Sequence, residues 1–226
     1  MSDSARPPAL GVDPAGNGAA VLLHPGGARV RAAWVWTERS RAGCRVWELV
    51  SAQDRDGAYR VVTRRAVAPF GALGEVIREE TRALLGGVAY ALAGENAIVG
   101  RAMDTSIVIA RNAGRVLGPL EALAVGQAAE WVRATEWRSE ILALNPHTPR
   151  EEAKAHARKW MPIRIPSLVE VARLVGDPED LYDASGVAAW LDARLSRPTS
   201  SLPARKPSGR RQKPSAKGPA KSSRRG

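Results

Sequence analysis

The sequence predicts an α/β fold in which helices pack on a mixed β-sheet. Short apolar or alternating segments separated by glycine-rich turns fill the first third of the chain, which is typical of antiparallel strands. Amphipathic segments then alternate with short apolar runs, which indicates further strands that are connected through helices. With 226 residues, of which 44% are hydrophobic, the chain can build one sizeable core.

The first strands are interrupted by a tight turn that carries an acid. Pro14 cannot donate to a sheet ladder, and Gly16 and Gly18 tolerate positive φ, so the turn begins where Asp13 leaves the sheet. Residues 54–57 form a second turn of this kind. Five strands are predicted before residue 70, at 9–13, 18–23, 28–36, 44–50 and 58–67.

Beyond residue 70, helices alternate with short apolar runs. Residues 70–85 place apolar side chains on one face and end at Gly86 and Gly87, so they form an amphipathic helix. Residues 88–93 are entirely apolar, which suits a central strand covered on both faces. The remaining predicted elements are a helix at 105–124, capped by Asp104 and broken at Gly114 and at Gly118-Pro119, a strand at 129–132, and helices at 149–160, 167–174 and 177–195.

The positive charge is concentrated at the C-terminus. The chain has a net charge of +11, and residues 196–226 hold ten of its Lys and Arg residues and no acid, so the rest of the chain is nearly neutral. This segment is too polar to bury a core, and we expect a disordered basic tail that binds nucleic acid or serves only as a solubilising extension. Residues 1–8 are expected to be a flexible N-terminus. The predicted DNA contacts in the tail are Arg205, Lys206, Arg210, Arg211 and Lys213.

Two features predict a cytoplasmic protein without a membrane partner. No apolar run reaches the length of a membrane helix, and the N-terminus lacks an apolar signal region. Cys44 is the only cysteine, which excludes an internal disulfide and a multi-thiolate zinc site.

Acidic residues stand at positions that suit either turns or catalysis. Asp13 and Glu95 each end, or directly follow, an apolar strand. A strand-end acid is often only a turn former, but an acid at this position is also well suited to holding a metal ion. The choice between the two depends on what else lies near them.

The last predicted helix supplies two more acids. Asp183 shares the apolar stripe of the helix with Val187 and Leu191, where a carboxylate is costly unless it meets a cation or a metal. Asp180 has two interpretations. If Asp177 caps the helix, Asp180 lies in the first turn, where its carboxylate interacts favourably with the helix dipole. In the other interpretation, Asp180 is a further metal ligand.

Four short motifs follow one another along the chain. Residues 11–19 read Gly-Val-Asp-Pro-Ala-Gly-Asn-Gly-Ala, and Glu95 is followed by the segment 100–106. Trp137-Arg138 come after a predicted strand, and residues 180–184 read Asp-Leu-Tyr-Asp-Ala. In this order the motifs resemble the RuvC family of Holliday-junction resolvases, particularly its phage-type members. They are similar, in turn, to the family's first-strand motif, its second acid with loop and helix, the segment before its lysine-bearing helix, and its Asp-x-x-Asp-Ala helix start. Ala15 in place of glycine, Gly94 and two extra strands depart from the family pattern.

The resemblance implies a ribonuclease H-like fold over residues 9–195. Its central five-stranded mixed sheet would be flanked by helices, with extra antiparallel strands near residues 44–67. The catalytic and metal-binding carboxylates Asp13, Glu95, Asp180 and Asp183 would converge on one edge of this sheet.

Four acids in one cleft repel each other unless divalent cations neutralise them. Oxygen ligands favour Mg²⁺, with Mn²⁺ as a substitute, and two ions about 4 Å apart suit phosphodiester hydrolysis. The expected products are a 5′ phosphate and a 3′ hydroxyl. The implied substrate is branched DNA, above all a four-way junction, and two symmetric nicks in such a junction imply a homodimer.

Basic and hydroxyl side chains in the body are candidates for DNA contacts. Arg101, Thr105 and Ser106 lie before or at a helix N-terminus, where amides can receive a phosphate. The helix at 149–160 carries a basic face that is either simply solvated or in contact with phosphates. Its basic residues are Arg150, Lys154, Arg158 and Lys159.

Two other function classes compete with a nuclease. An actin-like or sugar-kinase-like ATPase also opens with a strand, an acidic glycine turn and a strand, but it predicts a second such turn in a longer chain. A DNA-binding recombination accessory protein would keep the fold without cutting, and retention of all four acids argues against it.

Overall fold

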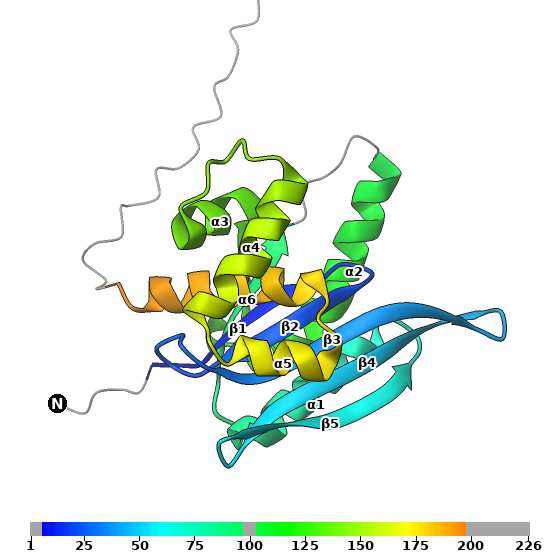
Figure 1. Ribbon diagram of the computed structural model, residues 1–226. Helices are drawn as coiled ribbons and strands as arrows, with labels where there is room; N and C mark the ends of the chain where they lie inside the picture. Colours follow the sequence, from blue (N-terminus) through cyan, green and yellow to red (C-terminus); the bar gives the residue numbers. More distant parts are fainter. Residues whose placement is uncertain (1–5, 97–102, 198–226) are drawn as a thin grey trace, which may run out of the picture. The chain divides into compact units, whose positions relative to one another are not determined.

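A seven-stranded mixed sheet lies at the centre of the molecule, and helices flank it (Figure 1). The structure is a computed structural model that describes residues 6–96 and 103–197. Most of the predicted N-terminal segment and basic tail, together with Arg101, lies outside these residues. The strands are β1 (Ala9–Asp13), β2 (Gly18–Leu23), β3 (Val30–Arg41), β4 (Cys44–Arg55), β5 (Ala58–Val67), β6 (Ala91–Asn96) and β7 (Glu130–Arg133). The helices are α1 (Ala72–Leu85), α2 (Met103–Glu121), η1 (Val125–Gln127, a 3₁₀ turn), α3 (Ala134–Leu142), α4 (Arg150–Arg164), α5 (Leu168–Val175) and α6 (Glu179–Leu195).

The order of the strands is β5-β4-β3-β2-β1-β6-β7. Strands β1 to β5 form an antiparallel meander, whereas β6 and β7 run parallel to β1. The predicted α/β class with a mixed sheet is therefore confirmed. The antiparallel strands expected near residues 44–67 are β4 and β5, and they extend one end of the sheet. No helix in the described segments is long and apolar enough to cross a membrane.

Helix α2 is continuous where the sequence predicted breaks. It runs from Met103 to Glu121 through Gly114 and Pro119. The predicted breaks are wrong because Val116, Leu117 and Leu120 are buried in the core, and this packing outweighs the low helix propensity of glycine and proline.

Several element bounds also differ from the sequence prediction. Strands β3 and β4 each continue five residues further than expected, to Arg41 and Arg55, because they pair with each other along a long hairpin. Strand β6 begins three residues later than expected, at Ala91, and extends through Glu95 to Asn96, so Glu95 lies within the strand. Helix α3 was not predicted; it begins directly after β7, without a loop.

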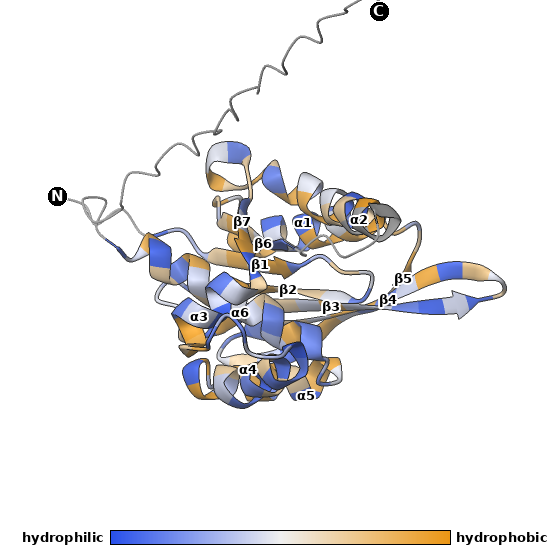
Figure 2. Ribbon diagram, turned by 90° about the horizontal axis from the view of Figure 1, so that it is seen from above, coloured by the Kyte–Doolittle hydropathy of each residue, from blue (hydrophilic) through white to orange (hydrophobic). Residues whose placement is uncertain are grey.

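Each face of the sheet packs on its own set of helices (Figure 2). Leu10 and Val12 of β1 pack on the face that α1 and α2 cover, here called the α2 face. The opposite face, here called the α6 face, lies under α3 to α6 and takes Ala9. Alternate residues of each strand thus enter separate cores.

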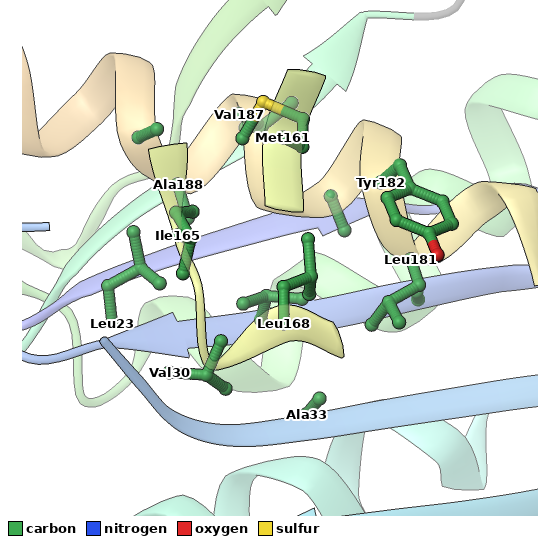
Figure 3. Packing of buried hydrophobic residues seen from close by; sticks show 14 of the residues in the cluster. Leu23, Val30, Ala33, Met161, Ile165, Leu168, Leu181, Tyr182, Val187 and Ala188 are labelled. Carbon is green, nitrogen blue, oxygen red and sulfur yellow. The ribbon is translucent and has the colours of Figure 1, made fainter. Parts of the chain in front are cut away.

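Helices α4, α5 and α6 form a continuous apolar core with the antiparallel strands (Figure 3). Leu23 and Val30 of the sheet pack with Met161, Leu168 and Val187, and all five side chains are fully buried. This packing fixes α6 across β1 and β2.

Gly11 lets the backbone of α6 lie directly on β1. A Cβ atom at Gly11 would come within 2.5 Å of the carbonyl oxygen of Ala184 and closer still to the backbone nitrogen of Ala188. No side chain fits in that space, so residue 11 must be glycine for helix and strand to approach this closely. The contact holds the first turns of α6 beside the end of β1.

Gly11→Ala is therefore expected to lower the free energy of unfolding by about 3 kcal/mol, because the new methyl group collides with helix backbone that cannot move independently. Gly114→Ala is the matched control. Gly114 lies in α2 with open space around its Cα, so alanine there should raise stability by about 0.5–1 kcal/mol. Urea denaturation followed by circular dichroism measures both changes. Equal stability of the two variants would contradict the close contact.

Candidate active site: a cluster of four carboxylates

Asp13 and Glu95 lie at the same edge and on the same face of the sheet. Strands β1 and β6 are parallel neighbours, with Val12 paired to Gly94, so the two acids follow at adjacent positions. Asp13 lies two residues beyond Gly11 and Glu95 two residues beyond Ala93, which packs in the α6-face core. The period of two therefore places both carboxylates toward α6.

Gly94 has a packing role in this arrangement. A Cβ atom there would lie 2.6 Å from Cδ1 of Leu117 on α2. The absence of a side chain at Gly94 thus lets α2 pack closely behind the strand that carries Glu95.

Helix α6 adds Asp180 and Asp183 to these two acids. The helix begins at Glu179 with Pro178 as its N-cap, so the predicted capping role of Asp177 is wrong. The Asp177 carboxylate instead accepts hydrogen bonds from Tyr182 and Arg158. Asp180 lies in the first turn, half-buried, and Asp183 lies one turn later with only 4% of its surface exposed.

The pKa values show that the four carboxylates act on each other. Burial, followed by repulsion from Glu95, Asp180 and Asp183, raises the pKa of Asp13 well above its usual range. Burial and the charge of Asp183 raise the pKa of Glu95 to about 7. Burial also raises the pKa of Asp180, against the opposing effect of Lys154. The folded protein therefore holds protons at this site that free carboxylates would have released.

Arg138 of α3 neutralises the most deeply buried acid. Its Nη2 donates to Oδ1 of Asp183 at 2.9 Å, and both side chains are at least 90% buried. Asp183 was predicted to require a cation or a metal on the apolar face, and Arg138 is the cation that the structure provides. In the sequence, Trp137-Arg138 stood out only as a motif, and no local pattern pointed to the pairing of Arg138 with Asp183.

Trp137 orients Glu95. Its indole Nε1 donates to Oε2 of Glu95 at 2.9 Å. The ring is held because it packs directly against Gly186, where a Cβ atom would be 2.5 Å from its Cε3 atom. A glycine in α6 thus fixes a tryptophan in α3, which in turn fixes an acid in β6.

The basic face of α4 lies along the start of α6. Arg150, Lys154 and Arg158 are spaced four residues apart and so share one face of the helix. Lys154 Nζ donates to Glu179 at 2.9 Å, and although burial opposes it, this bond together with the charges of Glu179 and Asp183 raises the pKa of Lys154. Arg158 pairs with Asp177. These residues counterbalance acids, so the helix face is more than a solvated surface.

Lys159 does not share the face of α4 that carries Arg150, Lys154 and Arg158. Its ammonium lies 5.5 Å from the ring centre of Trp160. Thr105 and Ser106 lie in the first turn of α2. Arg101 and the predicted tail contacts Arg205, Lys206, Arg210, Arg211 and Lys213 lie outside the described residues.

The donor set fits a hard divalent cation, but it is not arranged as a finished site. In residues 6–96 and 103–197, no three acidic, histidine or cysteine side chains stand where they could hold a metal ion together. Four carboxylates close enough to raise the pKa values of Asp13, Glu95 and Asp180 are nevertheless the groups that such a cation stabilises. Trp137 and Arg138 each hold one oxygen of these carboxylates in place.

Glu95→Gln should make stability less dependent on pH. A raised pKa means that the folded state binds the proton more tightly, so the free energy of unfolding falls as pH rises from 4.5 to about 7. Without divalent ions, the wild type should lose on the order of 2–3 kcal/mol more than the variant over this range. The amide oxygen of the variant can still accept the hydrogen bond from Trp137. Urea titrations in chelator at pH 5 and pH 8 measure the difference, and parallel pH profiles would contradict the assignment.

Arg138→Met should leave the buried charge of Asp183 without a partner and lower the free energy of unfolding by about 3–5 kcal/mol. Adding Asp183→Asn should restore most of that loss, because the amide carries no charge. Arg133→Met, at an exposed residue of β7, is the control and should change stability little. A double variant as unstable as Arg138→Met alone would show that the ion pair is not the cause.

The function is inferred from this cluster and from the elements that hold it. No protein-family model matches the sequence, and no curated protein matches it.

Proposed function

We propose that the protein is a metal-dependent, structure-selective DNA endonuclease with a ribonuclease H-like fold, of the RuvC type that resolves four-way junctions. The observation that carries the proposal is the position of Asp13 and Glu95. Asp13 is the last residue of β1 and Glu95 the last but one of the adjacent parallel strand β6, both toward one face of the sheet, and α6 brings Asp180 and Asp183 to the same place.

The architecture supports this proposal. Strands β3, β2, β1, β6 and β7 form a five-stranded mixed sheet with helices on both faces, and β4 and β5 extend it. The acids lie at the carboxyl ends of β1 and β6, the edge at which open α/β sheets bind their ligands. This is the arrangement that the sequence resemblance implies.

The chemistry follows from the charge of the cluster. Two Mg²⁺ ions at such a site would activate a water for in-line attack on a phosphodiester and stabilise the leaving 3′ oxygen. Asp13 and Glu95 would provide oxygen ligands from the sheet, and Asp180 and Asp183 from the helix. Trp137 and Arg138 act as positioning residues, since each holds one carboxylate oxygen in place.

The proposed substrate is branched DNA bound by a homodimer in the cytoplasm. Arg150 and Lys154 lie near the acids, as their effect on the pKa of Asp180 shows. They can contact the phosphates that flank the scissile bond, and the basic tail would add contacts that do not depend on sequence.

A non-catalytic DNA-binding accessory protein is the second candidate. One observation favours it: Arg138 already neutralises Asp183, as expected of an acid that no longer binds metal. Cleavage in the presence of a divalent cation separates the two candidates. The ATPase alternative gains no support, since the described residues form one sheet and not two similar halves.

The full-length protein should nick a synthetic four-way junction in Mg²⁺ or Mn²⁺ and leave a matched linear duplex intact. Asp13→Asn and Glu95→Gln should lower the rate at least about a hundredfold, because each removes a charged ligand. Junction binding should be retained or tightened, since less negative charge faces the phosphates. Glu75→Gln is the control, because Glu75 is exposed on α1 behind the other face of the sheet. Cleavage by Asp13→Asn at the wild-type rate would overturn the proposal, and junction binding without cleavage by the wild type would favour the accessory protein.

A further inference from the structure

The β3–β4 hairpin extends beyond the sheet edge at which the acids lie. Asp13 pairs with Ala19 of β2, and Ala19 pairs with Val35 of β3. Strand β3 then continues for six more residues, to Arg41, before the chain turns. At about 3.4 Å per residue the hairpin reaches roughly 20 Å past Asp13. Figure 1 shows this hairpin extending past α5.

Three arginines on this extension of the sheet share the α6 face with the acid cluster. Val35 packs in the core of the α6 face, so Arg39 and Arg41, four and six residues further along, lie on that face as well. Arg64 of β5 is paired with Val50, which packs in the same core. With their neighbours on β4 and β5, these arginines line an open hollow of about 410 Å³.

The charge on this arginine surface (Arg39, Arg41 and Arg64) is only partly balanced. Arg39 pairs with Glu48 at 3.5 Å. Within the part of the chain that the structure describes, Arg41 and Arg64 have no acidic partner. On the opposite face, at the same end of these strands, the arginines are paired: Arg45 lies 3.1 Å from Glu38, and Arg65 lies 4.0 Å from Glu80. At this end of the strands the unbalanced positive charge thus lies on the face that carries the acids.

We propose that the arginine surface binds the sugar-phosphate backbone of a duplex arm of the DNA that is cut at the acid cluster. The inference rests on the proposed nuclease function and adds a substrate-binding surface on the strands that extend the five-stranded core. Successive strand pairings connect Asp13 on β1 with Arg64 on β5, four strand spacings away. This separation is about 19 Å, which corresponds to roughly six base pairs of duplex. Asp13 and Arg64 therefore lie within the length of one duplex arm of each other.

Backbone phosphates fit these side chains better than an apolar partner does. A guanidinium presents a planar set of donors that matches phosphate oxygens, and its charge displaces counterions from DNA. The arginines stand on paired strands, so their spacing is fixed before the DNA arrives. A rigid array of this kind can select the direction of an arm, which a flexible basic segment cannot do.

Arg41→Gln with Arg64→Gln in the full-length protein tests the surface. In chelator, where no cleavage occurs, binding to a four-way junction at 0.1 M salt should weaken roughly tenfold or more. The slope of log affinity against log salt should become shallower by about 2, since two phosphate contacts are lost. Arg45→Gln with Arg78→Gln is the matched control, because it removes the same charge from the opposite side of the sheet, where Arg45 pairs with Glu38 and Arg78 of α1 pairs with Glu75. Equal losses in both double variants would overturn the proposal, since only net charge would then matter.

Cys44 offers a second test that does not rely on affinity. It is the only cysteine, it is exposed, and it is paired with Arg41 on the hairpin, so its side chain lies on the arginine surface. A photoreactive maleimide on Cys44 should cross-link to a duplex arm of the junction roughly seven base pairs from the cleavage site, since Cys44 lies about 25 Å from Asp13 along and across the strands. Cross-linking spread evenly along all arms, or none in a bound complex, would contradict the proposal.

The outcomes separate this inference from the proposed function. Cleavage that depends on Asp13, combined with unchanged binding by Arg41→Gln/Arg64→Gln, would leave the nuclease standing and exclude the arginine surface. A position-specific cross-link and a shallower salt slope without any cleavage would leave the surface standing and exclude the nuclease.

Discussion

The direct contact between helix α6 and strand β1 at Gly11 is the constraint on which the candidate site depends. Because no side chain separates the two backbones, the first turns of α6 lie within reach of the end of β1. Asp180 and Asp183 thereby come close enough to Asp13 to raise its pKa. A larger residue at position 11 would move the helix, and with it half of the acids.

A balance of charge keeps such a cluster folded in the absence of a metal. Arg138 offsets Asp183, Lys154 acts against the raised pKa of Asp180, and protons bound at Asp13 and Glu95 reduce the remaining repulsion. Any divalent cation that binds must therefore displace protons and compete with Arg138. Binding should consequently strengthen as pH rises through the range in which Glu95 titrates.

The extension of the sheet by β4 and β5 changes what the five central strands can do. These two strands lengthen the α6 face beyond the helices that cover it and place arginines in line with the acids. A sheet edge is usually a hazard for aggregation, and charged residues protect it. Arg64 of the edge strand β5 also belongs to the arginine surface, so this residue can serve both purposes.

The sequence by itself determined most of the elements and the acidic positions, because these depend on local periodicity and turn chemistry. The turn at Asp13, the strand-end position of Glu95 and the helix that carries Asp183 were all visible in it. Only the tertiary structure decided how these acids are partnered. The pairing of Arg138 with Asp183, the bond from Trp137 to Glu95 and the unbroken helix α2 all join residues that are distant along the chain or depend on core packing. Local patterns carry no record of such contacts, since their free energy arises only when the sheet and helices assemble around one another.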